Sequence, residues 1–167
     1  MEKYSLPYFG ELDPGNLEEY YDVDINFNGQ EISIDLNLGN SKIAVERFDL
    51  VKRFLENIEA FDKNNKIFIA QDYDDEGSDT VRTYVEHHLE EMDETDLSGL
   101  VDFKSDAIAP EKQLINSLKL VRVGLYPDEN ENQFAVFDYS IGKDLTDDLV
   151  VLLTDQQGHI DHITMES

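Results

Sequence analysis

The chain has 167 residues, and its 38 Asp and Glu against 13 Lys and Arg give a formal net charge of −25 at neutral pH. A chain with so few Lys and Arg is poorly suited to bind nucleic acid or an anionic membrane. Its excess of carboxylates favours a basic protein partner. The absence of cysteine excludes disulfide scaffolds and thiolate chemistry. A hydrophobic content of 40% is enough for a packed core, and the length predicts a single domain over residues 1–167.

The sequence shows neither a targeting segment nor a membrane segment. Residues 1–7 lack a basic region followed by an apolar run, and no apolar stretch is long enough to cross a bilayer. Together with the lack of cysteine, these features predict a soluble protein of a reducing compartment, the cytoplasm.

The chain is expected to begin with loop and then a β-hairpin. Residues 1–19 contain two prolines and two glycines, which predict mostly loop. Residues 21–27 and 30–38 then alternate between apolar and polar side chains, as half-buried strands do. Asn28-Gly29 between them is typical of a type I′ turn, which fixes the register of the two strands.

This register places Asp22 opposite Asp35, with Asp24 nearby, on a polar face that we expect to meet water. Like charges directly opposite one another destabilise a ladder by up to about 1 kcal/mol. One interpretation is that a cationic partner or ion relieves this cost, so that the three carboxylates form a binding surface. The other interpretation is an exposed pair that salt screens.

The middle of the chain has the periodicity of helices. Apolar residues recur at three- and four-residue steps over Val45–Asp62, and Asn64-Asn65 is expected to end that helix. The short apolar run Lys66–Gln71 fits a helical turn or a strand, and we favour the helix. A further helix is expected from Ser78 or Asp79 to about Met92, and a short one from Pro110.

The last third predicts four strands in a meander: Lys119–Tyr126, Phe134–Ile141, Leu149–Thr154 and Ile160–Met165. The third of these is apolar on both sides, which indicates an interior strand. With the hairpin, the meander predicts an α+β fold: a mainly antiparallel sheet of about six strands with helices on one face.

A second candidate site lies within this meander. Symmetric closure of the loop over residues 127–133 places Arg122 opposite Asp138 and Tyr126 opposite Phe134, all on the face away from the core. One interpretation is a cross-strand ion pair that the N-terminal segment covers. The other is an aromatic-rimmed binding patch anchored by the arginine.

Metal-binding patterns are weak in this sequence. Residues 72–77 place carboxylates at the first, third and fifth positions of a calcium loop and glycine at the sixth, but Thr83 occupies the twelfth position, where the loop needs Glu. An acidic loop that caps the next helix is the preferred interpretation. His88 is expected in the core and His87 in solvent, and His159 and His162 point to opposite faces of a strand. We therefore predict no metal and no cofactor.

Several segments resemble an uncharacterised bacterial domain-of-unknown-function family of small acidic cytoplasmic proteins, of the kind found in Bacteroidetes-type genomes. The similar runs lie at residues 72–77, 84–89, 120–127, 135–139 and 163–167, so the resemblance covers nearly the whole chain. Some such families are immunity proteins that neutralise a toxin. The resemblance implies that role by analogy of size and charge, and it implies no catalytic residues.

The sequence contains neither a Gly-x-Ser-x-Gly nucleophile motif nor a glycine-rich phosphate loop. The preferred hypothesis is a non-catalytic acidic protein that binds a basic partner, as an immunity protein does. One alternative is a small-molecule or ion-binding module at Arg122 and Asp138 or at residues 72–77. A second alternative is a carboxylate-based hydrolase, for which 38 acidic residues give no distinctive pair.

Overall fold

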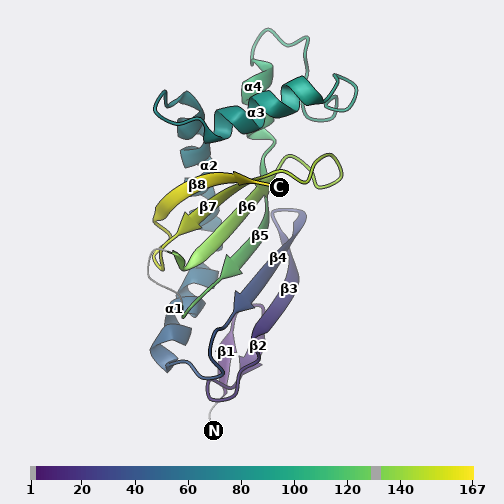
Figure 1. Cartoon of the computed structure of the whole chain (residues 1–167). Coiled ribbons are helices and arrows are strands. Elements are labelled where there is room, and N and C mark those ends of the chain that lie inside the picture. The colour runs from purple at the N-terminus through teal and green to yellow at the C-terminus, as the bar shows by residue number, and fades with distance from the viewer. Residues whose placement is uncertain (1–2, 129–132) are drawn as a thin grey trace.

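The computed structural model describes residues 3–128 and 133–167, and within them the chain forms a six-stranded sheet, a two-stranded hairpin and four helices (Figure 1). The large sheet contains, in spatial order, β3 (Tyr20–Phe27), β4 (Gln30–Asn37), β5 (Lys119–Leu125), β6 (Ala135–Ser140), β7 (Leu149–Thr154) and β8 (Ile160–Glu166). Every pair of neighbours is antiparallel except β4 and β5, which are parallel. The predicted α+β fold with a mainly antiparallel sheet is therefore confirmed.

The hairpin formed by β3 and β4 has the predicted turn and register. Asn28 and Gly29 have φ values of 50° and 82°, as a type I′ turn requires. Phe27 pairs with Gln30, and Asp22 lies opposite Asp35. The middle of the 127–133 loop lies outside the described residues, but the expected pairing of Arg122 with Asp138 is present on the strands it joins.

Four helices pack on the sheet: α1 (Val45–Glu56), α2 (Ile58–Asp74), α3 (Thr80–Glu91) and α4 (Pro110–Asn116). In Figure 1, α1 and α2 lie behind the sheet, and α3 and α4 lie at its end next to β8. Phe54 of α1 packs its ring against Phe134 and Phe137, at centroid distances of 5.2 and 5.8 Å. The apolar side chains of the strands that point toward these helices form one continuous core with them.

The prediction that one helix runs from Val45 to Asp62 and ends at Asn64-Asn65 is wrong. The break lies at Asn57, which leaves helical geometry and whose side-chain amide donates to the carbonyl of Arg53 at 2.7 Å. Asparagine favours helix ends because its side chain competes for backbone groups. The second helix, α2, continues through residues 64–71, which confirms the helix favoured for the apolar run Lys66–Gln71. Asn65 lies on the buried side of α2.

The N-terminal segment is mostly loop, as predicted, but it also contains a short hairpin of β1 (Tyr4–Leu6) and β2 (Gly10–Leu12), which the sequence analysis does not predict. The Tyr4 ring packs on Phe48 of α1 at 5.1 Å, and its hydroxyl donates to Asp49. This hairpin therefore packs on α1, so the expectation that the N-terminal segment covers Arg122 is wrong, whereas the expected cross-strand ion pair of Arg122 with Asp138 is present at 3.3 Å.

Candidate functional site on the open face of the sheet

The face of the six-stranded sheet turned away from the helices carries most of the predicted site residues, and we call it the open face (Figure 1). Strand register places its side chains in two rows that cross from β3 to β8. One row is Asp22, Asp35, Gly124, Val136, Leu153 and His162, and the other is Asp24, Ser33, Arg122, Asp138, Val151 and Thr164.

Arg122 lies at the centre of the open face and bridges three strands. Its Nε and Nη2 donate to the two carboxylate oxygens of Asp35 at 2.7 and 2.8 Å, a bidentate pair. Nη1 donates to Asp138 at 3.3 Å, and Nη2 also donates to the Tyr126 hydroxyl at 3.2 Å. Because these contacts use four of the five N–H groups of a guanidinium, Arg122 has little donor capacity left for a ligand.

Gly124 makes this arrangement possible. A Cβ atom at that position would lie 2.5 Å from Nη2 of Arg122 and 3.2 Å from Oδ2 of Asp35. The guanidinium therefore lies over the bare backbone of Gly124, and any side chain there would displace it.

Asp35 corrects the expectation that the polar face of the hairpin meets water. Its side chain is buried, because β4 is an interior strand with β5 as its parallel neighbour. Asp22 and Asp24 are exposed, as predicted, since β3 is the edge strand. The repulsion between Asp22 and Asp35 is thus relieved within the chain, by Arg122, and requires no external cation.

Phe134 is the second correction. It was expected beside Arg122, but only 1% of it is exposed and its ring packs on Phe54 in the helix-side core. Phe134 directly precedes β6, so the alternation of a regular strand does not fix its direction. Tyr126 does lie beside Arg122, and with Gln133, Val136 and Leu153 it lines a shallow hollow of about 300 Å³.

The electrostatics of the open face are dominated by carboxylates. Burial raises the pKa of Asp138, the positive charge of Arg122 lowers it, and the charges of Glu166 and Asp35 raise it again. Hydrogen bonding to Asp35 raises the pKa of Arg122, so the guanidinium stays charged. Two carboxylates thus surround one cation at the centre of a face whose edges are also acidic.

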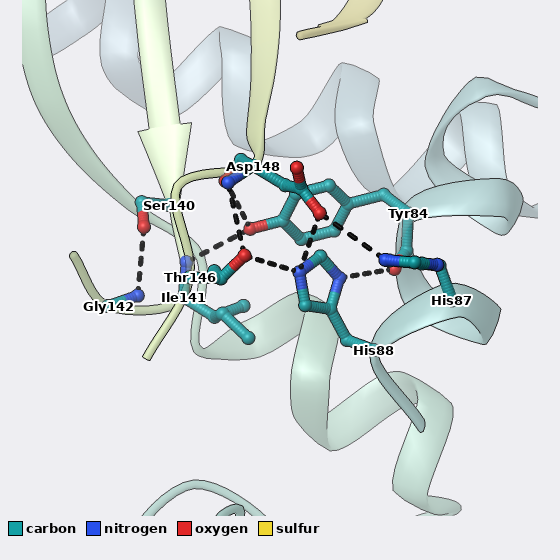
Figure 2. A network of polar contacts seen from close by, with 8 residues as sticks. All are labelled: Tyr84, His87, His88, Ser140, Ile141, Gly142, Thr146 and Asp148. Carbon is teal, nitrogen blue, oxygen red and sulfur yellow. Dashed lines mark hydrogen bonds and ion pairs between the residues drawn. The ribbon is translucent and has the colours of Figure 1, made fainter. Parts of the chain in front are cut away.

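A second polar network, shown in Figure 2, joins α3 to the loop between β6 and β7. The Tyr84 hydroxyl donates to the carbonyl of Asp148 at 3.0 Å and accepts the backbone N–H of Ile141 at 3.4 Å. Burial raises the pKa of Tyr84 to about 12. His88 contacts the Tyr84 carbonyl through Nδ1 at 2.6 Å and the Thr146 hydroxyl through Nε2 at 3.0 Å.

This network superficially resembles a hydroxyl, histidine and carboxylate triad, but the geometry differs. A triad places the carboxylate on Nδ1 and the nucleophile on Nε2. Here Nδ1 faces a carbonyl of its own helix, while Asp148 lies 3.5 Å from Nε2, on the same side as Thr146. His88 is buried and His87 exposed, as predicted. No sequence pattern points to Asp148 and Thr146, because these residues reach His88 only through the fold.

The calcium-loop pattern at residues 72–77 serves as a link between helices. Residues 72–74 are the last of α2, and the buried Asp72 carboxylate accepts from the Ser78 hydroxyl at 2.6 Å and from the Val81 N–H at 3.1 Å. Asp72 thereby satisfies a free backbone donor at the start of α3. In the part of the chain that the structure describes, no group of three His, Asp or Glu residues is arranged to hold a metal ion.

Comparison with known proteins gives no match, whether to a family model, a curated protein or a solved structure. The resemblance to a family of small acidic bacterial proteins therefore stays a prediction. None of the described helices has the length and apolar character needed to cross a bilayer. The fold and the site define an α+β protein with one helix-covered and one open sheet face.

Proposed function

We propose that this is a non-catalytic binding protein that takes a basic partner protein on its open face. The observation that carries the proposal is the composition of that face. Antiparallel sheets with a solvated face usually present polar side chains there. The centre of this face instead holds the partly exposed side chains of Tyr126, Val136 and Leu153 around the Arg122 cluster.

The edges of the open face support a basic partner. Asp22 and Asp24 of β3, Glu31 of β4 and Glu166 of β8 are exposed carboxylates on this face, and the Tyr20 ring beside them is 54% exposed. Protein interfaces combine apolar surface with a polar, charged rim, and aromatic residues and arginine are enriched among the residues that contribute most to binding. A net charge of −25 would speed encounter with a cationic partner.

Binding is favoured over carboxylate-based hydrolysis by the state of the two central acids. Asp35 and Asp138 both accept from Arg122, and neither lines the hollow beside it. Two acids that share one guanidinium are poorly placed to act as general acid and base on a substrate. Within this proposal, neutralisation of a toxin by a cytoplasmic bacterial immunity protein is the specific role that the acidic face suits.

The test is a binding measurement with the product of the neighbouring gene as partner. Asp22→Lys combined with Asp24→Lys reverses two exposed charges on the open face, and we expect the dissociation constant measured by calorimetry to rise at least about tenfold. Asp35 is left intact, because its loss would unpair Arg122 in the fold.

The matched control is Glu90→Lys combined with Glu91→Lys, which changes the net charge equally on the exposed surface of α3. We expect this pair to have a much smaller effect, which salt screens. An equal loss in both double variants would indicate non-specific attraction between charges and would contradict an interface on the open face.

A further inference from the structure

A second cavity lies on the opposite, helix-covered side, at the end of the sheet where the β3–β4 turn meets α2. It has a volume of about 270 Å³. Its wall is formed by residues 27–30 of the turn, by Asp62 and Lys66 of α2, and by Lys119 and Leu120 at the start of β5. Because Phe27 and Leu120 belong to the helix-side core, the cavity is separate from the open face.

The charge of this cavity differs from that of the rest of the molecule. Acids outnumber bases almost three to one in the chain, yet the cavity is lined by two lysines and one carboxylate. Among the described residues, Lys119 forms no ion pair. The Nζ of Lys66 is 3.5 Å from Asp62, too far for a strong hydrogen bond. Both ammonium groups therefore keep donors for an anion.

The inner wall supplies an acceptor. Asp62 is 2% exposed, and its Oδ1 accepts from the Tyr139 hydroxyl at 2.7 Å, while its Oδ2 has only the distant Lys66. Asp62 therefore keeps an open acceptor position on the inner wall of the cavity.

We propose that this cavity binds a small hydroxylated anion, of the sugar phosphate or sugar acid class. The anionic group would lie between Lys66 and Lys119, and a hydroxyl would donate to Oδ2 of Asp62. The Phe27 ring offers an apolar surface for the carbon skeleton of the ligand. The cavity volume of about 270 Å³ lies just below the usual range for ligand pockets, so it has room for one small ligand only.

The experiment is titration calorimetry on the whole chain with D-glucose 6-phosphate and D-gluconate, which carry the two kinds of anionic group. Their fragments, D-glucose and inorganic phosphate, serve as comparisons. We expect at least one hydroxylated anion to bind at least about tenfold more tightly than either fragment, because only it engages the lysines and Asp62 together. The absence of binding by both anions at millimolar concentration would overturn the proposal, and so would equal binding of inorganic phosphate.

Lys119→Ala tests the site itself, since this exposed lysine can be removed without disturbing the core. We expect binding to weaken at least about tenfold. The control is Lys63→Ala, which removes the same charge from an exposed position on α2 and should leave the affinity unchanged. Equal affinity in Lys119→Ala and the parent protein would overturn the proposal. The open-face variant with Asp22→Lys and Asp24→Lys should bind the anion as the parent does, so the two proposals fail separately.

Discussion

Arg122 and Gly124 act as one unit, in which the absence of a side chain at one residue sets the position of the other. The guanidinium lies over Gly124 and neutralises the buried Asp35. Breaking a buried ion pair from one side costs about 3–5 kcal/mol, because the other charge is left unpaired. The glycine at this position is therefore a requirement of packing and charge, not of backbone conformation.

Gly124→Ala is expected to lower the free energy of unfolding by about 2–3 kcal/mol, because the new methyl group forces Arg122 away from Asp35. Urea denaturation measures this change. The control is Gly99→Ala, at an exposed position where a Cβ atom meets no neighbour within 4 Å, and we expect a change below about 0.5 kcal/mol there. A similar small change in both variants would show that Arg122 can keep its contacts with Asp35 without the glycine.

At the scale of elements, the acidic segment between α2 and α3 links the two helices through a hydrogen bond. The sequence predicts that these helices follow one another in the chain, but it does not predict this contact. The carboxylate of Asp72 comes from the last turn of α2, yet it accepts from the backbone at the start of α3. The residue in the usual capping position, Asp79, makes no side-chain cap hydrogen bond. Capping of α3 is therefore a contact between two helices, made by a residue of α2.

Asp72→Ala is expected to lower the free energy of unfolding by about 2 kcal/mol, because a buried N–H of α3 and the Ser78 hydroxyl lose their acceptor. Amide hydrogen exchange should quicken first at the N-terminal turn of α3. Asp79→Ala serves as control, and we expect a loss below about 0.5 kcal/mol. If Asp79→Ala is the more damaging of the two, capping by Asp72 is refuted.

For the whole molecule, the dominant property is the excess of carboxylates. A net charge of −25 on 167 residues opposes compaction through self-repulsion. Most of these carboxylates are exposed, so the repulsion is long-ranged and open to screening. The ion pairs of Asp35 and Asp138 with Arg122 are short and part-buried, and salt should affect them less.

Sodium chloride is therefore expected to stabilise the protein, raising the free energy of unfolding by about 1–2 kcal/mol between low and high ionic strength. Urea midpoints at the two salt concentrations measure the effect. The double variant with Glu90→Lys and Glu91→Lys, which carries four fewer net negative charges, should gain less from the same salt. A loss of stability with salt would show that attractive ion pairs outweigh the repulsion.

The sequence by itself determined the local structure and part of the site. The turn at Asn28-Gly29, the register that pairs Asp22 with Asp35, and the pairing of Arg122 with Asp138 all follow from alternation and turn length. These features depend on residues close together in the chain. The sequence pattern does not predict the break at Asn57, because the apolar periodicity continues from α1 into α2. Periodicity alone does not show where one helix ends and the next begins.

Only the tertiary structure decided how the two halves of the sheet join. β4 and β5 are separated by the helical half of the chain, and their parallel pairing leaves no short-range pattern in the sequence. That pairing makes β4 an interior strand, buries Asp35 and brings it to Arg122 across a separation of 87 residues. Whether Asp35 is buried and which cation it pairs with depend on which strand lies next to β4. The order of the strands is decided by the packing of the whole molecule.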